Sequence, residues 1–211
     1  MNVNKRLLVR LQDRKQQMNQ QVTLVDIRAR FPALAIDLKY ASADNITGQP
    51  IYAEARCLLH PDAAAALERS LRIAQLAGLN LQVLDAYRPQ QAQQLLWNAC
   101  PNQDYVVPIA LGSNHSRGTA IDVTLIDENG QPLDMGTAFD EMDDLSHPYH
   151  PAVPQAAQRN RLLLNAIMFG GGFKGISTEW WHFELPDAAG YPLLDDVFAC
   201  LSPAHTDGVI P

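Results

Sequence analysis

Residues 112 to 125 read Gly112-Ser113-Asn114-His115-Ser116-Arg117-Gly118-Thr119-Ala120-Ile121-Asp122-Val123-Thr124-Leu125. Gly118 and its polar neighbours are typical of a turn. Residues 120–125 alternate as a strand, so the even-numbered side chains share one face. The side chain of His115 would then project from the turn and that of Asp122 from the strand. This pattern can direct two metal ligands at one point. Such a site needs a third ligand from elsewhere in the chain.

A second stretch near the end of the chain offers that ligand, and it reads Ser177-Thr178-Glu179-Trp180-Trp181-His182-Phe183-Glu184-Leu185. A catalytic zinc commonly has three protein ligands and keeps one position for water. His115, Asp122 and His182 are residue types that suit this role. Glu179 is the candidate general base, because a carboxylate must take the proton of the attacking water and pass it to the leaving amine.

The spacing within the second stretch constrains this hypothesis. On one regular strand, Glu179 and His182 would face opposite sides. We therefore expect Glu179 in the approach and a strand over residues 181–185. The residues alone leave alternatives open, namely a hydrogen-bonded pair of His115 with Asp122, a structural ion pair of Arg88 with Asp85, and a different metal site at His147 and His150.

The composition excludes some classes of function. The chain has 211 residues, a net charge of -7 and 47% hydrophobic residues, which is enough for one globular domain with a real core. The acidic balance argues against nucleic acid or an anionic membrane as the main partner. No run is long and apolar enough to span a membrane. The three cysteines, Cys57, Cys100 and Cys200, are far apart and indicate reduced thiols in a cytoplasmic protein.

The order of elements predicts an α+β fold. We expect an N-terminal extension over 1–21, whose composition is compatible with disorder, and one domain over 22–211. Strands are expected at 34–40, 79–84 and 120–125. Helices are expected from Pro61 to Gly78, after Pro89, and over 155–168, where Gly170-Gly171-Gly172 would end the last one. The prediction is a single domain with a small, mainly antiparallel sheet flanked by helices.

The two motifs resemble the signatures of D-alanyl-D-alanine dipeptidases of the VanX type, within the LAS group of zinc peptidases that share the Hedgehog/DD-peptidase-like fold. The likeness is closest to the chromosomal branch of Gram-negative bacteria and runs from about residue 24 to about 195. It includes Asp37-Leu38-Lys39-Tyr40, Asp44-Asn45-Ile46-Thr47-Gly48, Asp85-Ala86-Tyr87-Arg88-Pro89, Met135-Gly136 with Phe139-Asp140, and Gln158-Arg159-Asn160-Arg161.

The resemblance implies a role for each matching residue. His115, Asp122 and His182 would hold one zinc ion per chain, and Glu179 would be the general base and acid. Arg88 would stabilise the tetrahedral intermediate, as a permanently charged guanidinium can. The residues implied to line or support the substrate pocket are Tyr40, Asp85, Ser113 and Asp140.

The expected function is zinc-dependent hydrolysis of D-Ala-D-Ala to two D-alanines in the cytoplasm. The expected partner is a small dipeptide, with no nucleic acid and no membrane, and a homo-oligomer is compatible with the sequence. Two alternatives remain: a peptidoglycan DD-carboxypeptidase or endopeptidase of the same zinc group, and a non-catalytic zinc-binding module.

Overall fold

The structure is a computed structural model, and it describes residues 23–194. The predicted extension over 1–21 and the last part of the predicted domain, from residue 195, lie outside the described residues. Within residues 23–194, no helix is both long enough and apolar enough to cross a membrane.

A five-stranded sheet forms the centre of the fold, in the order β2-β4-β5-β7-β6. Only β2 and β4 pair in parallel, and the other three pairings in this sheet are antiparallel. The α+β prediction with a mainly antiparallel sheet is therefore confirmed. The strands are β2 (Ala35–Ile36), β4 (Asn80–Asp85), β5 (Ala120–Ile126), β6 (Lys174–Gly175) and β7 (His182–Glu184).

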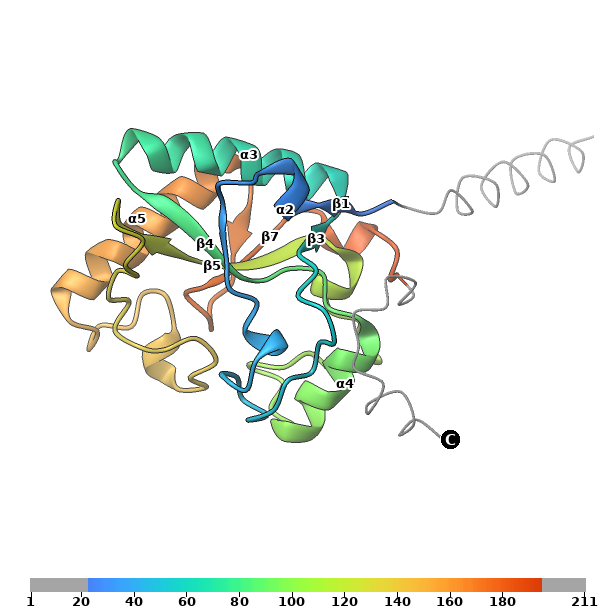
Figure 1. Cartoon of the computed structure of the whole chain (residues 1–211). Helices are drawn as coiled ribbons and strands as arrows, with labels where there is room; N and C mark the ends of the chain where they lie inside the picture. Colours follow the sequence, from blue (N-terminus) through green and yellow to red (C-terminus); the bar gives the residue numbers. More distant parts are fainter. Residues whose placement is uncertain (1–22, 195–211) are drawn as a thin grey trace, which may run out of the picture.

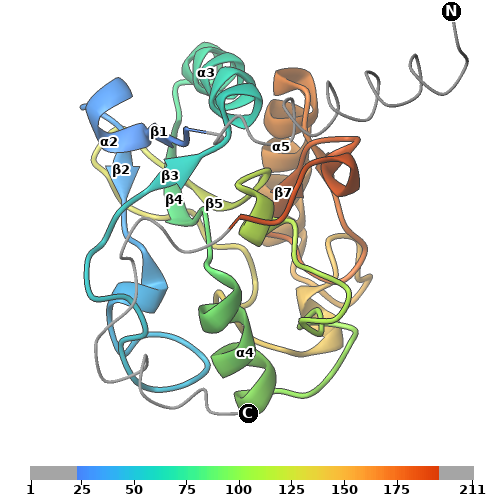
Figure 2. The same ribbon diagram turned by 90° about the vertical axis from the view of Figure 1, so that its right-hand side faces the viewer.

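Two long helices, α3 (Pro61–Leu76) and α5 (Gln155–Gly171), pack together on one side of the sheet (Figure 1). Helix α4 (Gln90–Ala99) lies away from them, together with the long loops, as Figure 2 shows from a second direction. The shorter elements are β1 (Val25–Asp26), which pairs with β3 (Leu58–Leu59), the helix α2 (Ile27–Arg30), and the 3-10 turns η1 (Lys39–Ala41), η2 (His115–Arg117), η3 (Asp144–Ser146) and η4 (Ala188–Gly190).

The contact between α3 and α5 corrects one expectation about the glycine run. Helix α5 continues through Gly170 and Gly171 and ends at Gly172, whose φ of 103° is left-handed. A Cβ on Gly171 would lie 1.9 Å from the Ser70 hydroxyl oxygen and 2.9 Å from the Ala66 carbonyl oxygen of α3. Residue 171 is therefore a helical position that only glycine fits, because the two backbones approach too closely there for any side chain.

The strand expected over 34–40 is the largest error in the predicted elements. Only Ala35–Ile36 form β2, and the chain turns into η1 at Lys39. The turn lets the Tyr40 carbonyl accept from the amides of both Ile51 and Tyr52, at 2.8 and 2.9 Å. The alternation of residues 34–40 thus describes a buried turn as well as it describes a strand.

A row of polar side chains crosses the otherwise apolar centre of the sheet. Asp85 pairs with Asp122 in the β4–β5 register, and Asp122 pairs with His182 in the β5–β7 register. All seven residues of β5 are buried, so the even-numbered face predicted for it faces other protein atoms rather than water. This register brings residues 85, 122 and 182 together across three strands.

Candidate metal centre and active site

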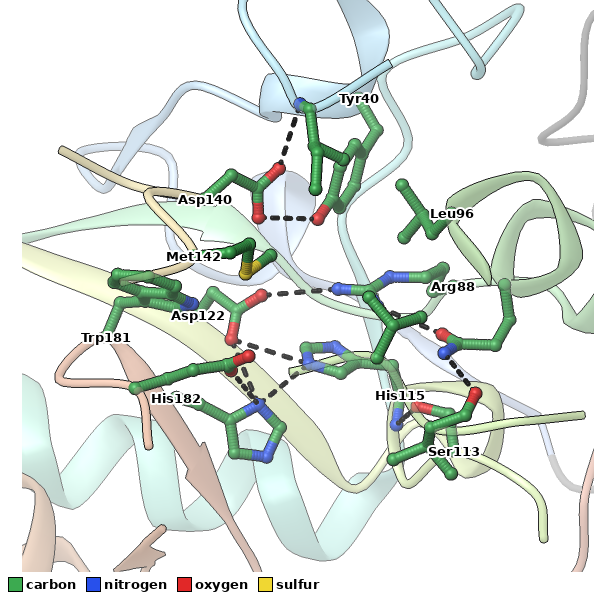
Figure 3. Close-up of a pocket in the computed structure, with 15 residues that line it drawn as sticks. Tyr40, Arg88, Leu96, Ser113, His115, Asp122, Asp140, Met142, Trp181 and His182 are labelled. Carbon is green, nitrogen blue, oxygen red and sulfur yellow. Dashed lines mark hydrogen bonds and ion pairs between the residues drawn. The ribbon is translucent and has the colours of Figure 1, made fainter. Parts of the chain in front are cut away.

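Three side chains from three elements converge in one buried cluster. His115 comes from η2, Asp122 from β5 and His182 from the first position of β7. The His115 Nε2 and His182 Nδ1 atoms lie 3.1 Å apart, and Asp122 Oδ1 lies 3.2 Å from His182 Nδ1 and 3.4 Å from His115 Nε2. Figure 3 shows the three side chains pointing at one another.

The spacing of these atoms suits zinc. Tetrahedral zinc with bonds of about 2.0–2.1 Å to nitrogen and oxygen holds neighbouring ligand atoms about 3.3 Å apart. The three distances between the candidate ligand atoms fall around that value. Two imidazoles and one carboxylate are also a donor set that catalytic zinc sites use, with a fourth position left for water or substrate.

Each histidine is held at its second ring nitrogen. His115 Nδ1 lies 2.7 Å from the Ala86 carbonyl oxygen, which can only accept, so Nδ1 carries the proton and Nε2 keeps its lone pair. His182 is held the other way round, because its Nε2 lies 3.2 Å from Glu184 Oε2. Its Nδ1 therefore faces the cluster. Such outer contacts set the tautomer and the ring direction of metal-binding histidines.

Glu184 was missed by the sequence reasoning, although a signal was present. It follows His182 by two positions in β7, and residues two apart on a strand share a face. Its carboxylate accepts from Asn114 Nδ2 at 2.8 Å and pairs with Lys174 Nζ at 3.0 Å. Burial alone would raise the pKa of Glu184, but its hydrogen bonds with His182, Asn114 and Lys174 lower it to about 2. Glu184 is therefore a carboxylate at neutral pH.

Glu179 lies in the coil before β7, as the spacing predicts, and its Oε2 is 3.9 Å from His182 Nδ1. It is buried, and burial raises its pKa to about 8 in the metal-free protein. A bound dication would lower that pKa again, because it favours the carboxylate. This carboxyl can therefore hold or release a proton near neutral pH, beside the candidate metal ligands.

Arg88 is fixed from three sides. Its Nε donates to Asp85 Oδ2 at 2.9 Å, one terminal nitrogen donates to Gln93 Oε1 at 3.0 Å, and the other lies 3.4 Å from Asp122 Oδ2. Its guanidinium carbon also lies 4.8 Å from the centre of the Tyr40 ring. The ion pair with Asp85 left open by the sequence is present, and it directs the guanidinium toward the candidate metal ligands.

Asp85 has a supporting position and does not line the pocket. Its side chain is fully buried, and its two oxygens accept from Arg88 Nε and from the Tyr52 hydroxyl. Its Oδ2 also lies 3.7 Å from Nδ1 of His115, one of the candidate ligands.

Two further predicted residues meet across the pocket from the metal ligands (Figure 3). The Tyr40 hydroxyl donates to Asp140 Oδ1 at 3.0 Å, and the Ile46 amide donates to Asp140 Oδ2 at 3.3 Å. Burial raises the pKa of Asp140 to about 7. Ser113 is on the opposite side, where its hydroxyl accepts from the His115 amide at 3.2 Å.

A pocket joins these groups, and its empty space of about 420 Å³ includes its open mouth. The predicted residues on its wall are Tyr40, Arg88, Ser113, His115, Asp122, Asp140, Glu179 and His182. Gln93 and six apolar side chains complete the wall. Sequence reasoning did not find them because their role depends on tertiary contacts, and the apolar ones are Ile46, Leu96, Val106, Val107, Met142 and Trp181.

The alternative sites considered from the sequence find less support. Within residues 23–194, His115, Asp122 and His182 are the single group of three such side chains close enough to share a metal, so His147 and His150 have no third partner there. Cys57 and Cys100 are free thiols, as expected, and Cys200 lies outside the described residues. Burial raises the pKa of Cys57, which keeps it a thiol rather than a nucleophile.

Comparison with known proteins shows which family the chain is similar to. A family model described as D-ala-D-ala dipeptidase, of the peptidase M15 group, matches residues 20–203. The chain is 67% identical to the D-alanyl-D-alanine dipeptidase of Escherichia coli K12, over 91% of this chain and 100% of that relative. It is 36% identical to the D-alanyl-D-alanine dipeptidase of Enterococcus faecium, over 72% of this chain and 85% of that relative.

A more distant likeness is to a solved vancomycin-resistance D,D-pentapeptidase in complex with Zn(II). It covers 62% of this chain and 74% of that one, at 14% identity and a TM-score of 0.41, which is too remote to bear on the chemistry here.

Proposed function

This chain belongs to the D-Ala-D-Ala dipeptidase family of M15 peptidases, and from that premise we propose that it hydrolyses D-Ala-D-Ala to two D-alanines with one zinc ion per chain. The observation that carries the proposal is the convergence, in one pocket, of a three-atom ligand set with Glu179 and Arg88. A metal that only stabilised the fold would need neither a buried carboxyl nor a guanidinium beside it.

Zinc, when held by His115, Asp122 and His182, would supply an acidified water molecule and polarise the scissile carbonyl. Glu179 takes the proton from the attacking water. It then returns that proton to the amide nitrogen as the carbon–nitrogen bond breaks, so one carboxyl acts first as base and then as acid. Its position 3.9 Å from a ligand nitrogen supports this role, because water and leaving amine must both come within reach.

Arg88 stabilises the negative charge that develops on the carbonyl oxygen. Three contacts, to Asp85, Gln93 and Asp122, hold its guanidinium before substrate arrives. A donor that is already oriented loses little entropy when the charge forms, which is why fixed cations favour the transition state over the ground state.

The two ends of the dipeptide have opposite charges, and we assign one side of the pocket to each. Asp140, oriented by Tyr40 and the Ile46 amide, binds the substrate ammonium. The Ser113 hydroxyl, on the opposite side, binds the carboxylate. A pocket with a partner for each terminus excludes longer chains, because a peptide bond at either end would leave buried polar groups unpaired.

We also propose a cytoplasmic location. The two free thiols, Cys57 and Cys100, support it, since thiols persist in a reducing compartment. Cell fractionation with an antibody against the native protein tests this, and recovery in the periplasmic fraction would contradict it.

The function is tested with purified, zinc-loaded protein on three substrates: D-Ala-D-Ala, L-Ala-L-Ala and a pentapeptide ending in D-Ala-D-Ala. We expect rapid release of alanine from D-Ala-D-Ala alone. Cleavage of the pentapeptide at a similar rate would indicate a carboxypeptidase instead. Stoichiometric zinc without cleavage of any substrate would indicate a binding module.

A further inference from the structure

A fully buried arginine, Arg161, lies on α5 outside the pocket. Its guanidinium donates to three main-chain carbonyls, those of Met135 at 2.6 Å, Leu145 at 2.8 Å and His147 at 2.9 Å. All three carbonyls belong to one segment, residues 135–147, which lies in the long connection between β5 and α5. Arg161 thus binds both ends of that segment to a rigid helix.

Residues 135–147 carry Asp140, which is held in an unusual backbone conformation. Asp140 is the one non-glycine residue with positive φ among residues 23–194, at 60°. A left-handed non-glycine residue costs energy and persists where the surroundings over-determine it. The bonds from Arg161 at either end of the segment supply part of that constraint.

The fourth bond of Arg161 leads to the catalytic side of the site through Thr137. The Thr137 hydroxyl accepts from Arg161 at 3.2 Å and from Trp180 Nε1 at 2.9 Å. It also lies 3.0 Å from the Ser146 hydroxyl, which in turn donates to the Glu141 carbonyl at 2.6 Å. Since Ser146 uses its own proton on Glu141, Thr137 must donate to Ser146. The Thr137 hydroxyl therefore makes three hydrogen bonds at once.

Trp180 is the residue next to Glu179, and two of its groups are bound to the same segment. Its indole N–H donates to Thr137, and its amide donates to the Ser146 carbonyl at 3.0 Å. Its ring also lies against Arg161, with 5.9 Å between the guanidinium carbon and the ring centre. The general base and the residue proposed to bind the ammonium are therefore joined by a short, buried network.

We propose that Arg161, Thr137 and Trp180 form a positioning junction that sets the distance between Asp140 and Glu179. This inference rests on the proposed function, in which Asp140 binds the substrate ammonium and Glu179 acts at the scissile bond. The free amino group of a dipeptide is one residue from that bond. A junction that fixes the two carboxyls relative to each other thereby selects a substrate with its amino group at that separation. Small errors in such positioning are costly to enzymes.

The test is a double-mutant cycle between Thr137→Val and Asp140→Asn with D-Ala-D-Ala as substrate. Thr137→Val keeps the side-chain shape and removes the hydroxyl that links Arg161, Trp180 and Ser146. We expect it to raise KM about tenfold, equivalent to about 1.4 kcal/mol. We expect kcat to change by less than about threefold, with zinc content unchanged. In the Asp140→Asn protein the same change should alter KM by less than about twofold, because its effect passes through Asp140.

Thr137→Ser is the matched control. It retains the hydroxyl and should keep KM near the wild-type value. If Thr137→Val does not fold or loses zinc, Trp180→Phe takes its place in the cycle, because it removes one hydrogen bond to the same hydroxyl and keeps an aromatic ring. The proposed junction is wrong if the wild-type enzyme cleaves D-Ala-D-Ala but the two substitutions act additively in the cycle. It is also wrong if the wild-type enzyme cleaves D-Ala-D-Ala and KM is unchanged in the variant. A wild-type protein that does not cleave D-Ala-D-Ala overturns the proposed function instead.

Discussion

His182 and Glu184 are two residues apart on β7, and their side chains meet at 3.2 Å between His182 Nε2 and Glu184 Oε2. The alternation of the strand places both on the face that carries the metal ligands. Glu184 is held in turn by Asn114, in the loop that leads into His115, and by Lys174 on the edge strand β6. One carboxylate thus connects the strand of one proposed ligand with the loop of another.

This relationship predicts that Glu184 controls zinc affinity without touching the metal. Glu184→Ala should weaken zinc binding by about 10- to 100-fold, the usual cost of losing an outer contact to a ligating histidine. Glu184→Gln should weaken it less, because the amide oxygen still accepts from Nε2. Competition with a chromophoric chelator measures both. An unchanged affinity in the alanine variant would show that His182 is oriented by packing alone.

Loss of Glu179, the proposed general base, should separate turnover from metal binding. Glu179→Gln preserves the size of the side chain and removes its ability to accept a proton from water, so kcat should fall by about 10²- to 10⁴-fold. Zinc content should stay at one ion per chain by elemental analysis. Glu128→Gln, at an exposed turn, is the matched control and should be fully active. Full activity in the Glu179 variant would remove Glu179 from the mechanism.

The close approach of α3 and α5 predicts that a glycine-to-alanine change at Gly171 destabilises the protein, whereas in most helices it stabilises. In a helix this change normally stabilises by about 0.5–1 kcal/mol. Gly171→Ala should instead lower the free energy of unfolding by about 1–3 kcal/mol, as overpacking does, because its Cβ would meet Ser70 and Ala66. Gly170→Ala is the control: its Cβ would meet only the terminal methyl group of Ile73, which can move. Urea unfolding of both variants measures the difference.

The elements with strong local signals could be predicted from the sequence. Pro61 and Gly78 bracket α3, and the apolar run before Asp85 becomes β4, because capping residues and unbroken apolar runs act over a few residues. The two-residue strands could not be predicted. Most of them exist only through a partner distant in the chain, as when β2 pairs with β4. A run of two residues carries no periodicity of its own.

The site also contains residues that could be predicted from the sequence and residues that could not. Types of residue and spacing point to His115, Asp122, His182 and Glu179, because metal ligation and proton transfer demand particular functional groups. The residues that orient them are harder to recognise, since Gln93 or Arg161 could serve many roles until tertiary structure brings them to Arg88 or to residues 135–147. Glu184 is intermediate, because its place on the strand is visible in the sequence but its contact with His182 is not.

Asp140 should give the enzyme an acid limb in its pH profile. Burial raises the pKa of Asp140 to about 7, so at pH 6 only about a tenth of the molecules have the carboxylate that pairs with the ammonium. We expect KM for D-Ala-D-Ala to rise about tenfold from pH 8 to pH 6, and this limb to be absent in Asp140→Asn.

The raised pKa of Asp140 also makes the folded protein less stable as the pH rises. A carboxyl whose pKa is higher in the folded protein than in the unfolded chain lowers stability as pH rises from about 4 to about 7, where the unfolded chain ionises first. Asp140→Asn should therefore raise the free energy of unfolding at pH 8, by about 1 kcal/mol after allowance for solvent and relaxation, and the gain should shrink toward pH 4. Urea unfolding of the metal-free proteins at the two pH values measures it. An equal difference at both would mean that Asp140 ionises in the folded protein as it does in the unfolded chain.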